Sequence, residues 1–168
     1  MASLADFVGR THQKIEYARL ILNEHLGSPS QHTGDAFERS HLEAFFFHFG
    51  GGVDSFLQEL NAHYELGLND PAVSRRTVRE KIIKLGIRVP PFVALETLDG
   101  KPDSFMALAT SMRNFVAHRG GLPMAHYFNG PTNLVHPVTR QEFPMDSNHL
   151  LRGWLAELEA FFMTFRTW

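Results

Sequence analysis

A chain of 168 residues with a net charge of −2, 43% hydrophobic residues and no cysteine has the composition of an ordinary globular domain. Residues 1–168 are expected to form a single domain, since a chain of this length buries roughly two-thirds of its unfolded surface. The lack of cysteine excludes disulfides and thiolate metal sites. The nearly balanced charge argues against a protein that coats nucleic acid regardless of sequence.

The sequence has neither the pattern of a secretion signal nor a run of roughly 20 apolar residues, the length that crosses a bilayer. A cytoplasmic location without membrane contact is therefore expected. The sequence contains 15 phenylalanines, and this high number predicts a core built on aromatic rings. The run Phe45-Phe46-Phe47 is expected to take part in core or interface packing.

Apolar residues at steps of three and four predict a first helix from Leu4 to just before Gly27, capped by Ser3 and Asp6. The turn-rich residues 27–34 that follow are expected to form a loop.

The second and longest helix is predicted from about Asp35 to Leu66, and it contains the three consecutive glycines Gly50-Gly51-Gly52. A glycine inside a helix costs about 1 kcal/mol relative to alanine. Three together therefore indicate either a kink or the close approach of another backbone. One bent helix is favoured over two separate helices.

Asp70-Pro71 is a helix start signal and predicts a third helix that ends at Leu85, before Gly86. Residues 75–88 hold six basic side chains against one acid, which indicates either a solvated helix face or a footprint for phosphates. Residues 89–98 contain two adjacent prolines and are expected to form a connector with at most a short helical turn.

The fourth helix is predicted to start after Pro102, with Asp103 or Ser104 as its cap, and to end at His118 or Arg119 before two glycines. Prolines interrupt the chain that follows, up to residue 145, and predict an irregular excursion or small hairpin with a turn near residues 129–130.

A final helix with a broad apolar face is expected after residue 147. The predicted fold class is therefore all-α, a four- to five-helix up-and-down bundle with an irregular loop or small hairpin before the last helix.

The end of the fourth helix carries the pattern Arg113-Asn114-x-x-x-His118 in unusual surroundings. Arg113 is the only charged residue from 104 to 117, although a solvated helix face normally carries several charges. One side of this helix is apolar and should face the core, and the other is small and uncharged, which suits close contact with a second subunit. A dimer built on it would bring two copies of Arg113 and His118 together across a two-fold axis.

These residue types suit phosphodiester chemistry without a metal. Arg113 would offer charged, forked donors to phosphate oxygens and to the charge of the transition state. His118 could move the proton of a ribose 2′-hydroxyl or of the leaving oxygen, a role that contributes about 10²–10⁴-fold. Asn114 could hold the imidazole or the phosphate. Alternatively, Arg113 and His118 are two cations that stabilise the C-terminal end of their helix.

The pattern Arg-Asn-x-x-x-His resembles the signature of the HEPN family of small helical domains. The resemblance implies a dimer in which Arg113, Asn114 and His118 line a cleft between protomers. It also implies an endoribonuclease that uses no metal or other cofactor, leaves a 2′,3′-cyclic phosphate, and acts in toxin–antitoxin or defence systems. Some toxin members carry a Tyr two places after the His, which a partner antitoxin modifies. Gly120 occupies that place here, with Tyr127 further along the chain.

Arg119, His126, Tyr127 and His48 complete the predicted site as substrate-binding residues. The expected partners are RNA or a nucleotide, a second copy of the chain, and an antitoxin or other partner protein. Two alternatives stay open: a non-catalytic helical module that binds nucleotides or proteins in the same cleft, and a metal-dependent bundle enzyme. No metal is predicted, because His41 and His48 lie seven residues apart without the tighter spacing of metal-binding motifs.

Overall fold

The computed structural model describes residues 3–25, 35–119, 121–126, 132–144 and 148–166. These residues form a mostly helical structure, as predicted, with a small antiparallel sheet. The helices are α1 (Leu4–Leu20), α2 (Asp35–His63), α3 (Arg75–Leu85), α4 (Pro90–Asp99), α5 (Phe105–Arg119) and α6 (Asn148–Phe165), and the strands are β1 (Met124–His126), β2 (Thr132–Val135) and β3 (Glu142–Pro144). A π-helical turn, η1 (Ile21–His25), continues α1, and a 3-10 turn, η2 (Asp70–Ala72), precedes α3.

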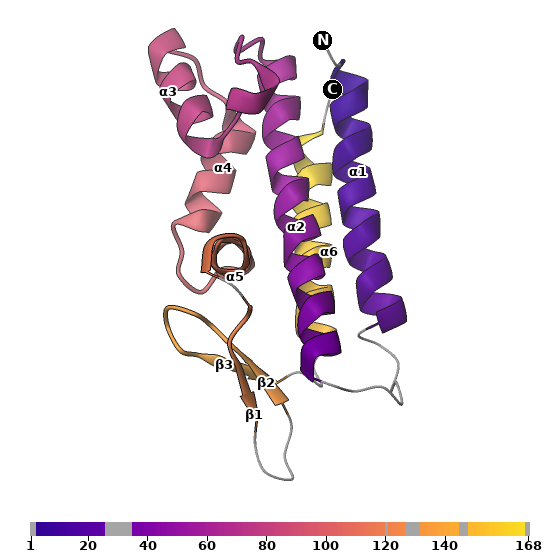
Figure 1. Ribbon diagram of the computed structural model, residues 1–168. Coiled ribbons are helices and arrows are strands. Elements are labelled where there is room, and N and C mark those ends of the chain that lie inside the picture. Colours follow the sequence, from indigo (N-terminus) through magenta and orange to yellow (C-terminus); the bar gives the residue numbers. More distant parts are fainter. Residues whose placement is uncertain (1–2, 26–34, 120, 127–131, 145–147, 167–168) are drawn as a thin grey trace.

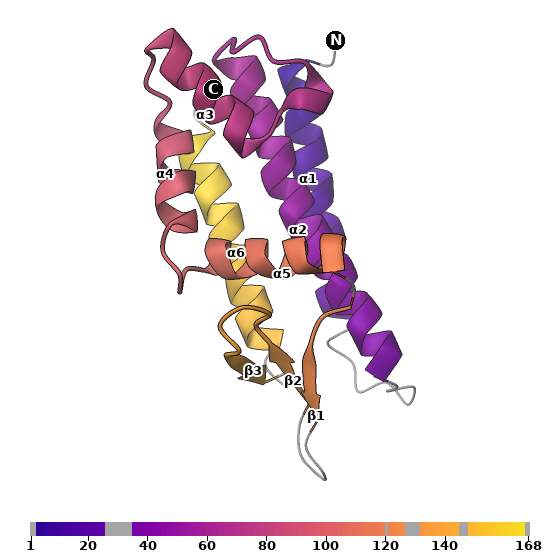
Figure 2. The ribbon, with the colours of Figure 1, turned by 60° about the vertical axis from the view of Figure 1, so that its left-hand side comes forward.

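The long helices α1, α2 and α6 lie side by side, with α5 seen end-on beside α2 (Figure 1). Turning the molecule shows that α5 runs across the long helices instead of alongside them (Figure 2). The described helices therefore depart from a simple up-and-down arrangement. They also outnumber the predicted four or five, because the supposed connector after residue 88 forms α4. Pro90 and Pro91 occupy its first turn, where no backbone amide is needed for helical hydrogen bonds.

Local capping decides where the first and third helices begin. At the start of α1, Ser3 Oγ accepts a hydrogen bond from the amide of Asp6 (3.2 Å), and the Asp6 carboxylate accepts one from the amide of Ser3 (2.7 Å), as predicted. The predicted start of the third helix at Asp70 is wrong. That residue opens η2, and a capping box at Ser74 starts α3 instead. Gly86 ends α3 as predicted, with a left-handed φ of 64°.

α2 is one continuous helix through its three glycines, which confirms the preference for one helix over two. The predicted close approach comes from side chains of other helices and not from another backbone. A Cβ atom at Gly50 would lie 2.8 Å from Cγ of Arg113, and one at Gly51 would lie 3.2 Å from Cδ of Lys14. Side chains of α1 and α6 contact the corresponding position of Gly52. The glycines thus allow neighbouring helices to lay side chains directly on α2.

The core is built on aromatic rings, as predicted. The fully buried phenylalanines include Phe45, Phe46, Phe49, Phe56 and Phe162. Phe56 and Phe162 stack with their ring centroids 4.7 Å apart. Phe47 is an exception, because one further helical step of about 100° carries it to the outer side of α2, where it is 57% exposed. Phe47 therefore does not contribute to the core.

The predicted excursion before the last helix forms a sheet with the strand order β1-β2-β3. Leu134 and Phe143 pair across β2 and β3, and both are buried. The ring of Phe143 lies edge-on to Trp154 of α6, with centroids 5.9 Å apart, so the sheet is packed on the last helix. The predicted turn near residues 129–130 and the loop at 27–34 lie outside the described residues. None of the described helices has both the length and the apolarity of a membrane span.

Candidate functional site

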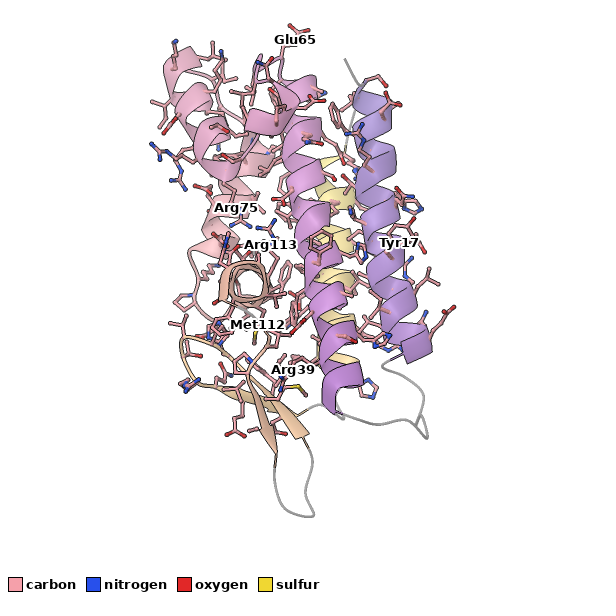
Figure 3. All side chains as sticks on the ribbon, viewed as in Figure 1. Tyr17, Arg39, Glu65, Arg75, Met112 and Arg113 are labelled. Atoms are coloured by element: carbon pink, nitrogen blue, oxygen red, sulfur yellow. The ribbon has the colours of Figure 1, made fainter. Side chains whose placement is uncertain are left out.

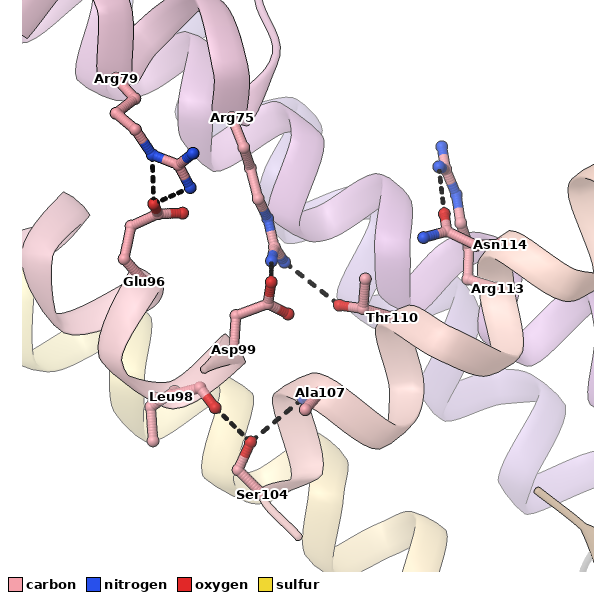
Figure 4. Close-up of polar contacts among 10 residues, drawn as sticks. All are labelled: Arg75, Arg79, Glu96, Leu98, Asp99, Ser104, Ala107, Thr110, Arg113 and Asn114. Carbon is pink, nitrogen blue, oxygen red and sulfur yellow. Dashed lines mark hydrogen bonds and ion pairs between the residues drawn. The ribbon is translucent and has the colours of Figure 1, made fainter. Parts of the chain in front are cut away.

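Both ends of α5, the helix with the predicted motif, are attached to other helices. At its start, Ser104 Oγ accepts a hydrogen bond from the amide of Ala107 (3.1 Å) and donates one to the carbonyl oxygen of Leu98 in α4 (Figure 4). Beyond its end, the amide of Leu122 donates to Oε1 of Glu43 on α2 (3.0 Å). These contacts hold α5 across α2.

The two sides of α5 differ as its sequence pattern predicts. The predicted inner residues Phe105, Leu108, Ala109 and Met112 are buried in the core, as is Met106, whereas Phe115 and Val116 are only half-buried. On its outer side Asn114, Ala117 and His118 are exposed, and Ala107 and Thr110 are half-buried. The outer side of α5 is thus small, uncharged and open to solvent near its end.

Arg113 leaves α5 sideways and crosses α2 over Gly50. Its Nη2 donates a hydrogen bond to Oδ2 of Asp54 on α2 (2.9 Å), and its Nη1 donates to Oδ1 of Asn114 (3.2 Å). Asn114 therefore supports the guanidinium. Because Arg113 reaches a neighbouring helix, stabilisation of the end of its own helix does not account for its position.

A cavity of about 540 Å³ opens beside Arg113, between α2, α5 and the residues that lead into α3. Phe49 and Val53 of α2 form part of its apolar wall, while Arg75, Thr110 and Asn114 add polar groups. A space of this size, with apolar and charged walls, is typical of small-ligand sites.

Arg75, the first residue of α3, is a second cation of the cavity. Its guanidinium forms an ion pair with Asp99 and donates a hydrogen bond from Nη2 to Oγ1 of Thr110 (3.2 Å), which connects the start of α3 to α4 and α5 (Figure 4). Its neighbours in the basic segment Arg76 and Arg79 are paired with acids outside the cavity. Most of that segment is therefore a solvated face, and Arg75 is its one member that lines the cavity beside Arg113.

His118 stands apart from Arg113 within the chain. Five residues along an α-helix correspond to a rise of about 7.5 Å and a rotation of about 140°. His118 is exposed on the outer side of α5 and does not line the cavity. The structure thus brings Arg113 and Asn114 together and leaves His118 outside the cavity.

His48 lies on the other side of α2, among residues of α1. Its ring is tilted against that of Tyr17, with centroids 5.1 Å apart, and lies edge-on to Phe47 at 5.6 Å. Burial, and secondarily the nearby Lys14 ammonium, lowers the pKa of His48. It does not line the cavity.

Arg119 and His126 belong to α5 and β1, but their side chains lie outside the described part of the structure, as does the whole of Tyr127. The structure therefore leaves their predicted roles in substrate binding untested.

Sequence patterns did not identify Asp54 and Arg75 as site residues, or Gly50 as the position over which Arg113 crosses. One signal was available. Gly50 and Asp54 are four residues apart on a helix and so share a face. The run of three glycines indicated that a neighbouring part of the chain lies close to this face of α2. Arg75 could not be distinguished from the other five basic residues of its segment by sequence alone.

Within the described residues, no three His, Cys, Asp or Glu side chains form a group that could hold a metal ion. Comparisons with protein-family models, with curated proteins and with solved structures find no match. The side chains around the cavity are therefore the basis for a functional assignment.

Arg113 is placed to bind an anion that enters the cavity. A guanidinium has five N–H donors, and Asp54 and Asn114 use two of them, which leaves 5 − 2 = 3 for a ligand. Asp54 is 56% exposed, and an exposed ion pair of this kind is worth only about 0–1 kcal/mol. An entering phosphate can therefore replace Asp54 at little cost.

Proposed function

We propose that this protein is a metal-independent endoribonuclease of the HEPN type, with a composite active site at the cleft of a homodimer. The observation that carries the proposal is the setting of Arg113, a half-buried guanidinium with unused donors beside a cavity. The outer side of the same helix presents Asn114, Ala117 and His118. Its small, uncharged surface supports packing of α5 against a second copy, which would bring His118 of one chain to Arg113 of the other.

In this reaction the ribose 2′-oxygen attacks the adjacent phosphorus and the bond to the 5′-oxygen breaks. His118 takes the 2′-hydroxyl proton as general base, and water supplies a proton to the leaving 5′-oxygen. Arg113 donates hydrogen bonds to the non-bridging oxygens, whose charge grows in the transition state. The products are a 2′,3′-cyclic phosphate and a 5′-hydroxyl end.

The first test is cleavage of a mixed-sequence RNA in EDTA by the wild type and by Arg113→Ala and His118→Ala. Each substitution is expected to abolish cleavage. The matched controls His12→Ala and Arg76→Ala, on the exposed faces of α1 and α3, should cleave like the wild type. Equal cleavage by all five proteins, or none by the wild type, contradicts the proposal.

A mixing experiment tests the composite site directly. If each site takes Arg113 from one chain and His118 from the other, a heterodimer of the two inactive variants contains one intact site. Free exchange of subunits makes half of the dimers heterodimers, so the mixture should recover about a quarter of wild-type activity, by the symmetry of a two-fold dimer. No recovery in a mixture that forms heterodimers would place both residues in one chain.

The alternative function is a non-catalytic module that binds nucleotides or proteins in the same cleft. It is favoured by the position of His118, which stands apart from the cavity in the single chain. Nucleotide binding that depends on Arg113, together with no RNA cleavage by an intact dimer, would support this alternative.

A further inference from the structure

A cluster of aromatic rings and one lysine lies on the outer face formed by α1 and α2. We define the aromatic platform as Tyr17, Phe47 and His48. The Nζ of Lys14 lies 5.3 Å from the ring centroid of Phe47, and Phe47 and Tyr17 are 57% and 41% exposed. Nδ1 of His48 is buried and has no hydrogen-bond partner within the described structure. Exposed rings beside a cation form a surface for a ligand that combines flat groups with negative charge.

The platform and the site at Arg113 meet on the same strip of α2. Phe47, Gly50, Gly51 and Asp54 follow the spacing i, i+3, i+4 and i+7, so they share one helix face. α1 and α5 lie on opposite sides of α2 in Figure 3, where Tyr17 and Arg113 are labelled. A Cβ atom at Gly50 would lie 3.3 Å from Cδ of Arg113, and one at Gly51 would lie 3.3 Å from Cε of Lys14. Two cationic side chains therefore reach adjacent residues of α2 from opposite sides.

We propose that the aromatic platform and Lys14 bind single-stranded RNA, as a continuation of the site at Arg113 across α2. This inference rests on the proposed function. Bases of a single strand can stack on Phe47 and Tyr17, while Lys14 and Arg113 contact successive phosphates. Bases of a duplex are already stacked and paired, so they cannot reach these rings. The other occupant, a second copy of the chain, fits less well because a two-fold axis through the platform would bring two Lys14 ammonium groups together.

The test is the affinity of His118→Ala protein for a fluorescein-labelled 12-nucleotide single-stranded RNA in EDTA, measured by anisotropy. This background prevents loss of the probe by the proposed cleavage. Phe47→Leu keeps apolar bulk but removes the ring, and it should weaken binding at least about fivefold, the lower end of the effect of one base–aromatic stack. Phe47→Trp should bind as tightly as its parent. Lys14→Ala should reduce the slope of log affinity against log salt by about 0.7, the value for one phosphate contact on a single strand.

Two control substitutions on α3 remove an exposed apolar side chain and an exposed cation at a distance from the platform. Ile83 is 72% exposed, so Ile83→Ala removes exposed apolar bulk, and Lys84→Ala removes an exposed cation; both should bind RNA like the parent. The proposal is overturned if the parent does not bind the single strand, or if Phe47→Leu and Lys14→Ala bind like these controls. Equal dependence on Phe47 for a duplex of the same sequence also overturns it, because base stacking would not be involved. Loss of the dimer in Phe47→Leu with unchanged RNA affinity would assign the face to a protein contact instead.

The platform and the proposed ribonuclease activity can fail separately. RNA binding that depends on Phe47 and Lys14, without cleavage by the wild type, would support the platform and contradict the ribonuclease. Cleavage by the wild type, with an unchanged KM in Phe47→Leu and Lys14→Ala, would support the ribonuclease and contradict the platform.

Discussion

Gly50→Ala is the most direct test of how Arg113 is held. Alanine in place of a mid-helix glycine stabilises a helix by about 1 kcal/mol. Here, however, the new Cβ would lie 2.8 Å from Cγ of Arg113 and 3.3 Å from its Cδ and Nε, so the arginine must move. Its contact with Asp54 is an exposed pair worth about 0–1 kcal/mol, and an off-rotamer side chain costs about 0.5–1.5 kcal/mol. In the wild-type background, the gain in helix stability and the cost of moving Arg113 should therefore nearly cancel.

The same substitution should behave differently once Arg113 is absent. An Arg113→Ala background removes the three atoms nearest to the new Cβ, so there Gly50→Ala should stabilise the protein by about 1 kcal/mol. The coupling energy between the two sites is therefore expected to be about 1 kcal/mol, within the range that double-mutant cycles resolve. The four proteins of the cycle are compared by urea unfolding, followed by circular dichroism.

Gly9→Ala is the matched control, because a Cβ atom at this position of α1 would meet nothing within 4 Å. It should stabilise the protein equally with and without Arg113. In the cleavage assay Gly50→Ala should lose activity as Arg113→Ala does, while Gly9→Ala should not. Equal stabilisation by Gly50→Ala in both backgrounds would refute the packing of Arg113 on Gly50.

Two further predictions concern buried groups outside the site. The fully buried Glu59 carboxylate accepts hydrogen bonds from Nη2 and Nε of Arg166 (2.7 and 3.0 Å); Arg166→Met should therefore cost about 3–5 kcal/mol in urea unfolding. The partner of Arg76 is exposed, so Arg76→Met should cost at most about 1 kcal/mol. Equal destabilisation by the two substitutions would contradict a stabilising role for the buried Glu59–Arg166 pair. Burial lowers the pKa of His136 and, with Lys14, that of His48. Because the unfolded chain then binds more protons, the free energy of unfolding should fall as the pH drops below about 6.5. His136→Gln should flatten this dependence between pH 7.5 and 5, and an unchanged slope would contradict it.

The parts of the fold that were predictable depend on local signals. The cap of α1, the start of α5 at Ser104 and the end of α3 at Gly86 each follow from a few neighbouring residues. Local signals also explain the errors. Asp70-Pro71 is a valid start signal, but Ser74 offers a stronger capping box four residues later. The helix α4 was missed because adjacent prolines usually end helices, although they are also tolerated in a first turn.

The site could be predicted only in part, because its contacts depend on how α5 crosses α2. The three glycines indicated that a neighbouring part of the chain lies close to α2. The isolated charge of Arg113 indicated that its guanidinium has a hydrogen-bond or ion-pair partner. Nothing local connects the two observations, since Arg113 and Asp54 are 59 residues apart. The direction in which α5 runs across the long helices decides which arginine meets which glycine, and that direction comes from packing of the whole core.

The energetics of this contact argue against a purely structural role. A glycine in the middle of α2 costs about 1 kcal/mol relative to alanine. The exposed pair between Arg113 and Asp54 contributes about 0–1 kcal/mol, so Gly50 and the ion pair together add nothing to stability. An alanine at position 50 with a small side chain at 113 would make α2 more stable. What the observed arrangement provides instead is a guanidinium in a fixed position beside a cavity, with donors left for a ligand.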